Sequence, residues 1–285
     1  MTERIISASG APYDGHGRDI MLDSMARVGF THIEPAFIVG YTETFDETAF
    51  TPAEARAWRN AIAAAGLSCH ALSSHIDLGA DNAVKIFTGR MEFAAAIGAK
   101  VIATNAAPRA RAASFLRNIE ALLKRAQALD ILIALENPGD GSSNLIDTAA
   151  DGAALVARIG SPHLGLNYDA ANTASHRPSL GDFAADGILA IPACVHAHIK
   201  DVRRTPEGWF FTPIGEGDIG CARILAAMAA RPDLPVSIEL PMRLHRDSRA
   251  QPVRRSAPVP LHDIEDGLRR SLGAVKAGLA SGSQH

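Results

Sequence analysis

Short apolar runs alternate along the chain with longer stretches in which apolar residues recur every three or four positions. The short runs predict β-strands and the longer stretches predict amphipathic helices. We expect strands at residues 4–9, 31–37, 67–74, 100–105, 131–136, 163–169, 193–200 and 235–240. We expect helices at residues 18–30, 51–66, 81–99, 112–129, 145–160, 180–190, 221–232 and 261–280.

Eight strand–helix units follow one another at a spacing of roughly 30 residues, which predicts a parallel sheet with right-handed crossovers. The chain length of 285 residues and the number of units are those of an α/β protein with a single (β/α)8 TIM barrel over residues 1–285. A doubly wound sheet is the alternative, but no linker or break in composition divides the chain. We also expect a long arginine-rich loop at residues 241–260 and a frayed tail at residues 280–285.

The composition, 47% hydrophobic and 21% charged, is typical of a globular protein in water. A net charge of −3 gives no reason to expect binding to nucleic acid or to a membrane surface. The cysteines are widely spaced, which favours a reducing compartment over a disulfide framework. The sequence shows neither a signal-peptide core nor an apolar run of the ~18 residues that a spanning helix needs. We therefore expect a cytoplasmic protein. The sequence does not decide between a monomer and a homo-oligomer.

Ionisable residues stand near the ends of four consecutive predicted strands, on the face opposite the apolar one. They are Glu136, Asp169 and Glu239, together with the pair His196 and His198. In a TIM barrel this face lines the interior, and the carboxyl ends of the strands form the catalytic mouth. A single such carboxylate could be a satisfied core group or a helix cap, but three of them in a barrel interior require pairing or a metal. An oxygen-rich set with one imidazole predicts one divalent ion, Mn²⁺ first, with Mg²⁺, Co²⁺ or Zn²⁺ as alternatives.

Five short segments at these strand ends resemble the xylose-isomerase-like TIM-barrel superfamily, which includes the sugar phosphate isomerase/epimerase proteins. In chain order they are ALENPGD, GLNYDAAN, HAHIKD, GEGDIG and SIELP. The resemblance implies a metal held by Glu136, Asp169, His198 and Glu239. It selects His198 because the family's ligand histidine is followed by two residues and then an acidic one. Strand geometry agrees, since His196 lies about 6.6 Å deeper along the strand and is expected to be a supporting or core histidine.

The resemblance also implies that Glu136 and Glu239 exchange protons with the substrate from opposite sides, as in ketose epimerases. A metal that polarises a carbonyl and the adjacent hydroxyl would lower the barrier to this transfer. Two positions depart from the epimerase pattern: Asn172 stands in place of a substrate-binding histidine, and Ser142 in place of a glutamate. Arg204 matches an arginine that contacts substrate in those epimerases.

We therefore expect a divalent-metal-dependent isomerase or epimerase that acts on a sugar, sugar phosphate or sugar acid by proton transfer adjacent to a carbonyl. The alternative is a metal-dependent lyase (dehydratase, decarboxylase or β-elimination) acting on a keto-sugar or keto-acid, which the departures at residues 142 and 172 favour. A non-catalytic sugar-binding barrel is a third hypothesis, but mere binding does not need two metal-bound glutamates. DNA repair, as in the more distant endonuclease IV, is disfavoured because that trinuclear site needs further histidines.

Lys200 shares the inward face of His198 and is a candidate catalytic acid or base, or a binder of a substrate carboxylate. The alternative is an ion pair with Asp201 or Glu239. Other polar residues end strands two, three and four or follow strand six, and they suit the hydroxyl groups of a small-molecule polyol or keto-acid. The predicted substrate-binding residues are Arg204, Asn172, His75, Glu34 and Asn105.

Three loops have open interpretations. Residues 40–50 form a lid over the pocket or a surface loop. Residues 241–260 carry five arginines, which suit capture of a phosphate or carboxylate, a solvated loop or a dimer contact. GEGDIG at residues 215–220 matches a dinucleotide fingerprint, but Glu216 and Asp218 would repel a pyrophosphate, so we expect a glycine-rich loop at the barrel mouth.

Overall fold

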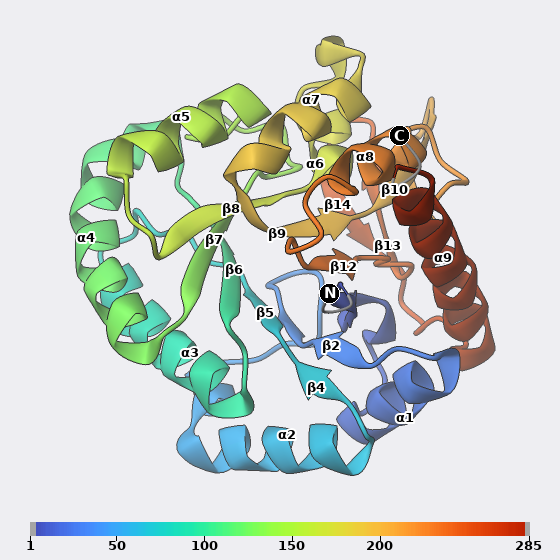
Figure 1. Ribbon diagram of the computed structural model, residues 1–285, viewed down its shortest axis with the longest axis horizontal. Coiled ribbons are helices and arrows are strands. Elements are labelled where there is room, and N and C mark those ends of the chain that lie inside the picture. Colours follow the sequence, from blue (N-terminus) through green and yellow to red (C-terminus); the bar gives the residue numbers. More distant parts are fainter. Residues whose placement is uncertain (1–3, 283–285) are drawn as a thin grey trace.

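The computed structural model describes residues 4–282, and its centre is a curled parallel sheet (Figure 1). In chain order the strands are β1 (Ile6–Ser9), β2 (His32–Glu34), β3 (Ala36–Phe37), β4 (Ser68–Cys69), β5 (Ala71–Ser74), β6 (Val101–Asn105), β7 (Leu132–Glu136), β8 (Leu164–Tyr168), β9 (Cys194–Ile199) and β12 (Val236–Ile238). β2 and β3 are two pieces of one predicted strand, as are β4 and β5. Because β2 pairs with β4 while β3 pairs with β5, the two ends of the strand order meet and the sheet closes.

Helices surround this sheet, as Figure 1 shows. They are α1 (Arg18–Val28), α2 (Pro52–Ala64), α3 (Ala83–Ile97), α4 (Ala112–Leu129), α5 (Ala149–Ile159), α6 (Ala170–His176), α7 (Phe183–Ala190), α8 (Cys221–Met228) and α9 (Leu261–Ser281). Short 3₁₀ turns lie at Ala11–Tyr13, Glu47–Phe50, Arg109–Arg111, Pro178–Leu180 and Ile191–Ala193. The predicted α/β TIM barrel is confirmed; α6, directly after β8, was not predicted.

One face of each strand packs against the helices. Ile133 and Leu135 of β7 are fully buried, and they belong to the same apolar cluster as Phe115 and Leu122 of α4. Removing this surface from water is the main force that holds helices on the sheet. The alternate residues of each strand point into the barrel, so the two-residue period decides which side chains reach the site.

A bulge interrupts the pairing of β8 with β9. The register shifts between residues 166 and 167, which leaves Val195 as an extra residue in β9. Val195 packs against a small interior cluster of Ala71, Val101 and Ala134. Gly165 makes room for it, because a Cβ at this position would lie 2.5 Å from Val195 Cγ1. Simple alternation along residues 193–200 would place Val195 on the outer face.

A second sheet of four antiparallel strands lies beside the barrel mouth, and the sequence pattern did not predict it. Its strands are β10 (Asp201–Thr205), β11 (Gly208–Thr212), β13 (Leu244–Asp247) and β14 (Pro252–Arg254), in this order. The segment expected to be an arginine-rich loop therefore contains two paired strands. β10 and β11 form a hairpin in which Thr205 pairs with Gly208 across a short turn, and aromatic residues such as those of WFFT are typical of strands. Gly208 is required in this turn, since a Cβ there would lie 2.0 Å from Arg246 O.

Helix α9 continues through Ser281, so residues 280 and 281 of the expected frayed tail are helical. Residues 283–285 of that tail lie outside the described residues. Within residues 4–282, no helix combines the length and the apolar character that crossing a membrane would require.

Candidate metal centre

Four ionisable side chains from four neighbouring strands converge at one end of the barrel. Glu136 ends β7, Asp169 follows β8, His198 lies in β9 and Glu239 follows β12. One ligand atom from each lies within 4.8 Å of the other three, and all four residues are buried. The strand-end pattern predicted these residues, and the structure brings them together into a cluster that could bind a metal ion.

The two oxygens of Asp169 have different roles. Oδ1 accepts hydrogen bonds from the backbone N–H groups of Ala171 and Asn172, at 2.9 and 3.1 Å, and so caps the start of α6. Oδ2 faces the cluster. The capping contacts fix the orientation of the carboxylate, which leaves one oxygen directed at the site.

The imidazole of His198 is held between two groups of carboxylates. Its Nδ1 lies 3.2 Å from Glu136 Oε1 and 3.4 Å from Glu239 Oε2, and its Nε2 lies 2.9 Å from Glu34 Oε1. Glu34 thus orients the ring from below, while Nδ1 faces the other ligand candidates. A carboxylate on the far nitrogen of a ligand histidine is the usual way in which proteins fix its ring orientation and tautomer.

His196 lies deeper in the barrel and has other partners. Its Nδ1 is 3.0 Å from Asn167 Oδ1, and its Nε2 is 3.5 Å from Glu34 Oε2. Burial lowers the pKa of His196 to about 4, so the ring is neutral near pH 7. Glu34, His196 and His198 also offer ligand atoms within 4.8 Å of one another. The four-residue cluster, with three carboxylates, is the richer donor set.

The charges in the cluster shift the pKa values of its members strongly. Burial acts to lower the pKa of His198, but the carboxylates of Glu34, Glu136 and Glu239 outweigh it and hold that pKa well above its usual value. Burial raises the pKa of Asp169 to about 6, although the neighbouring lysine opposes this shift. Pairs of ionisable groups perturbed in this way by burial and by specific neighbours are typical of functional sites.

Lys200 lies among the carboxylates of the cluster. Its Nζ is 2.6 Å from Asp169 Oδ2 and 2.5 Å from Glu239 Oε2, and the residue is 3% exposed. Burial opposes its charge, but Asp169 and Glu239 outweigh burial and raise the pKa of Lys200 above its ordinary value. The ammonium therefore supplies positive charge at the position where the sequence predicts a cation.

Asp201, next to Lys200, has a separate structural role. Its buried carboxylate accepts hydrogen bonds from the backbone N–H groups of Gly215, Gly217 and Ile219, at 2.9, 3.1 and 3.2 Å. Gly217 lies so close that a Cβ would be 2.2 Å from Asp201 Oδ1. The glycine-rich loop thus wraps a carboxylate of its own chain, and its N–H groups do not point toward a pyrophosphate.

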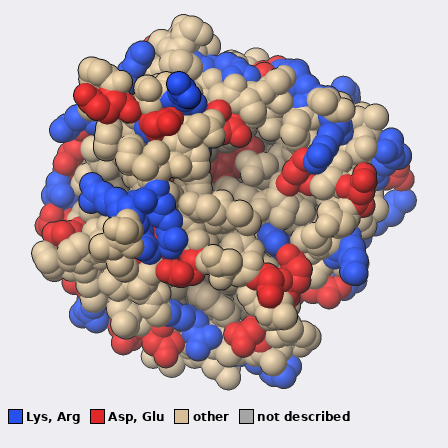
Figure 2. Space-filling view, turned by 180° about the vertical axis from the view of Figure 1, so that it is seen from behind, with Lys and Arg blue, Asp and Glu red and all other residues tan. Residues whose placement is uncertain are grey.

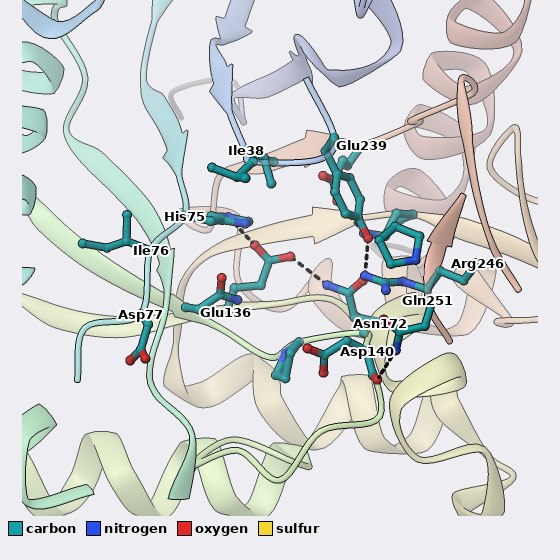
Figure 3. Close-up of a pocket in the computed structure, with 17 residues that line it drawn as sticks. Ile38, His75, Ile76, Asp77, Glu136, Asp140, Asn172, Glu239, Arg246 and Gln251 are labelled. Carbon is teal, nitrogen blue, oxygen red and sulfur yellow. Dashed lines mark hydrogen bonds and ion pairs between the residues drawn. The ribbon is translucent and has the colours of Figure 1, made fainter. Parts of the chain in front are cut away.

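A cavity of about 550 Å³ opens onto the cluster. On the face shown in Figure 2, opposite to that of Figure 1, a hollow lies near the centre with acidic atoms visible inside it. Six predicted site residues line the cavity: His75, Asn105, Glu136, Asn172, Lys200 and Glu239. The close-up in Figure 3 shows several of them converging on Glu136.

Neighbouring side chains hold Glu136 from both sides. His75 Nε2 lies 2.9 Å from its Oε2, and Asn172 Nδ2 donates to its Oε1 at 3.0 Å (Figure 3). Asn167 donates to Oε2 at 3.2 Å. These contacts keep the carboxylate ionised and fixed in place. His75 and Asn172, whose predicted role is substrate binding, thus position Glu136 in this structure.

Two predicted substrate-binding residues lie elsewhere. Glu34 is fully buried beneath His198, where it also accepts a hydrogen bond from Ser73, and it does not line the cavity. Arg204 is exposed on β10 and borders a different surface hollow, beside Trp209. The hairpin formed by β10 and β11 turns Arg204 away from the cluster, because it pairs with Trp209 in that sheet.

Tyr41 and Arg246 are among the cavity residues that were not predicted individually. Tyr41 comes from the segment 40–50, which was expected to be a lid or a surface loop, and Arg246 comes from β13. Arg246 Nη2 donates a hydrogen bond to the Tyr41 hydroxyl, which connects segment 40–50 to β13 at the pocket. The positions of both residues in segments after strand ends are the only signal that the sequence offered.

The barrel, with its acidic cluster at the mouth, defines a TIM-barrel protein with a candidate metal centre. A model of the xylose isomerase-like TIM-barrel family matches residues 22–259. The chain belongs to this family. No curated protein matches it in sequence.

Solved structures of enzymes share the fold at low sequence identity. D-psicose 3-epimerase from Clostridium cellulolyticum H10 matches with 12% identity and a TM-score of 0.75, covering 98% of this chain and 99% of that one. E. coli 3-keto-D-glucoside 4-epimerase matches with 15% identity and a TM-score of 0.69, covering 96% and 100%. A probable 3-DHS dehydratase involved in petrobactin synthesis in Bacillus anthracis matches with 15% identity and a TM-score of 0.68, covering 95% and 98%.

Proposed function

We propose that the chain is a divalent-metal-dependent isomerase or epimerase that acts on a sugar, sugar phosphate or sugar acid by proton transfer next to a carbonyl. The observation that carries this proposal is the buried cluster of Glu136, Asp169, His198 and Glu239 at the floor of a 550 Å³ cavity. Membership of the family and the sugar epimerases among the structural neighbours support it.

The residues of the cluster fit a divalent cation. Three carboxylates and one imidazole form a hard, mainly oxygen donor set, which suits Mn²⁺ first and Mg²⁺, Co²⁺ or Zn²⁺ as alternatives. Asp169 Oδ2 and His198 Nδ1 both face the cluster, while their other polar atoms are engaged by the start of α6 and by Glu34. When bound, such an ion would polarise the carbonyl and an adjacent hydroxyl of the substrate.

The proton transfers are assigned to Glu136 and Glu239. These carboxylates come from β7 and from the end of β12, so they approach the cavity from different sides of the barrel. One removes the proton next to the carbonyl and the other delivers a proton to the opposite face, as a general base and a general acid do. Contacts from His75 and Asn172 hold Glu136 in the orientation that this task requires.

Lys200 is the third catalytic candidate. It pairs with Asp169 and Glu239, not with Asp201, and it borders the cavity. Coordination of those two carboxylates to a metal would free the ammonium to donate a hydrogen bond or a proton to a substrate oxygen. His75, Asn105 and Asn172 are the proposed partners of substrate hydroxyls.

A metal-dependent lyase acting on a keto-sugar or keto-acid is the second candidate. The observation that favours it is the amide of Asn172, which donates to Glu136 Oε1 and to Asn137 O. An amide cannot exchange a proton near neutral pH, as a histidine at this position could. The probable dehydratase among the structural neighbours is compatible with this alternative.

One experiment separates these activities. The Mn²⁺-loaded protein is incubated in D₂O with a panel of ketoses, ketose phosphates and keto-sugar acids, and products are analysed by NMR and mass spectrometry. An isomerase or epimerase incorporates deuterium without any other change in composition, whereas a dehydratase or decarboxylase gives a lighter product. Glu239→Gln should lower exchange by about 10²–10⁴-fold, the contribution expected of a positioned acid or base. Absence of exchange and of lighter products across the panel would contradict the proposal.

A further inference from the structure

Arg246 differs from the other buried cations. Within residues 4–282, four lysine or arginine residues are at most 7% exposed: Lys200, Arg90, Arg243 and Arg246. The first three have ion-pair partners, as with Glu47 for Arg90 and Asp14 for Arg243. Arg246, 6% exposed, has no carboxylate within ion-pair distance among the described residues.

Among residues 4–282, the hydrogen-bond partners of the Arg246 guanidinium are all neutral. Its Nη1 donates to Ala250 O at 2.8 Å, and its Nη2 donates to the Tyr41 hydroxyl. Its buried Nε has no hydrogen-bond partner among the described residues. Asp140 is near enough for the charge of Arg246 to lower its pKa, but the two side chains form no ion pair. A buried charge without a paired carboxylate is unfavourable, so the guanidinium is suited to bind an anion.

The surroundings of Arg246 hold its side chain firmly at the cavity. In the second sheet Arg246 pairs with Trp209 of β11, and its guanidinium lies 5.5 Å from the centre of the Tyr41 ring. Gly139 lies against the guanidinium, since a Cβ there would be 2.8 Å from Arg246 Nε. A glycine in the loop after β7 thus admits the arginine to the pocket.

Arg246 borders the same cavity as the metal-ligand candidates Glu136 and Glu239 (Figure 3). The other arginines of residues 241–260 do not line it: Arg243 and Arg254 pair with Asp14, and Arg249 and Arg255 are exposed. Among the five arginines of this segment, the structure therefore singles out one that a bound substrate could reach.

We propose that Arg246 binds a carboxylate of the substrate, so that the substrate is a keto-sugar acid whose carbonyl end lies at the acidic cluster. This inference rests on the proposed function. A carboxylate fits better than a phosphate because, away from the acidic cluster, Arg246 is the one cation at the cavity without a carboxylate partner among the described residues. Lys200 lies within the cluster, beside Asp169 and Glu239, where our proposal places the carbonyl end of the substrate. The carboxylate of Asp140, which lines the same cavity, would repel the doubly charged phosphate group more strongly than a carboxylate.

The test compares acids with matched neutral sugars. D-fructuronate and D-tagaturonate are compared with D-fructose and D-tagatose, and with the ketose 6-phosphates, by calorimetric binding to the Mn²⁺-loaded protein and by deuterium exchange. The wild type should bind the better acid on the order of 10–100-fold more tightly than its neutral partner, as expected for a charged hydrogen bond in a pocket. Arg246→Gln should abolish this preference.

Two further variants separate charge from position. Gly139→Ala keeps the arginine but displaces its guanidinium, so it should also reduce the preference for acids. Arg249→Gln removes an exposed arginine of the same segment. This variant should retain the preference for acids. Thermal unfolding reports whether each variant is folded.

The outcomes are distinct. No preference for acids in the wild type, or an undiminished preference in Arg246→Gln, would overturn the inference. Tighter binding of the 6-phosphates would overturn the choice of a carboxylate. A preference for acids that depends on Arg246, without any exchange or lighter product, would support the anion site while contradicting the proposed function.

Discussion

The Lys200 ammonium lies 2.6 Å from Asp169 Oδ2, so a lysine and a candidate metal ligand form an ion pair at the centre of the cluster. Glu239 Oε2 lies 2.5 Å from the same nitrogen. Buried carboxylates this close together require a positive charge between them. In our proposal the lysine supplies it without a metal, and a divalent ion takes over that role in the active enzyme.

Replacing this lysine should therefore destabilise the protein most when metal is absent. We expect Lys200→Gln to lower the free energy of unfolding by about 3–5 kcal/mol in EDTA, because buried carboxylates lose their partner. Saturating Mn²⁺ should restore much of this loss. Denaturant unfolding with and without Mn²⁺ measures both values. Equal destabilisation in the two conditions would show that lysine and metal do not share the site.

A surface lysine provides the matched control. Lys124 pairs with Glu120 at 3.0 Å, and both side chains are exposed. Lys124→Gln should change the free energy of unfolding by less than about 1 kcal/mol, with no dependence on Mn²⁺.

Metal affinity should rise with pH. The carboxylates around His198 hold its pKa well above the usual value, and burial raises the pKa of Asp169 to about 6. Both groups must be deprotonated to bind a metal. Near neutral pH, binding of Mn²⁺ should therefore release the proton of His198. Below about pH 6 it should also release a proton from Asp169. The affinity should then increase about tenfold per pH unit around neutrality. Calorimetry in buffers of different ionisation enthalpy counts the released protons; an affinity independent of pH would contradict this prediction.

The two histidines of β9 should differ in their effect on metal binding. His198→Asn should lower Mn²⁺ affinity by more than about 100-fold, since it removes a ligand. His196→Asn should lower it by less than about tenfold, because His196 contacts Asn167 and Glu34 below the site. Metal content and Mn²⁺ titration of folded variants give the comparison. Retention of metal by His198→Asn and its loss from His196→Asn would reverse the assignment.

A side chain at Gly217 should destabilise the protein, because the loop packs closely around Asp201. We expect Gly217→Ala to lower the free energy of unfolding by about 1–3 kcal/mol, because its Cβ would lie 2.2 Å from Asp201 Oδ1 and 2.6 Å from Val202 O. Gly273→Ala is the control: it lies on an exposed turn of α9 with open space around it, and it should stabilise the helix by about 0.5–1 kcal/mol. Thermal or denaturant unfolding measures both; an unchanged stability of Gly217→Ala would contradict the tight packing of this loop around Asp201.

The periodicity of the chain was sufficient to predict the barrel and its acidic mouth. Glu136 and Asp169 stand where short apolar strands end, and the two-residue period places them on the inner face. Parallel strands then bring such ends together without any further information. The same rule fails at Val195, where a bulge changes the alternation.

The parts that the sequence did not reveal depend on contacts between distant segments. Arg246 could not be separated from the arginines around it, because its role follows from pairing of β13 with β11 and from contact with Tyr41. Arg204 shows the converse: a matching position in a motif lies on a hairpin that turns it away from the cavity. Spacing along a chain does not encode such long-range pairing.

The most direct test of the central claim is metal analysis of the wild type and of Glu239→Gln, purified without chelators or added metal. We predict close to one equivalent of a divalent metal in the wild type and markedly less in the variant, since the proposed site holds the ion with four protein ligands and the variant removes one of them. Removal of the metal by EDTA should abolish deuterium exchange into the substrate, and Mn²⁺ should restore it. Less than about a tenth of an equivalent, with no binding of added Mn²⁺, Co²⁺ or Mg²⁺, would contradict the account.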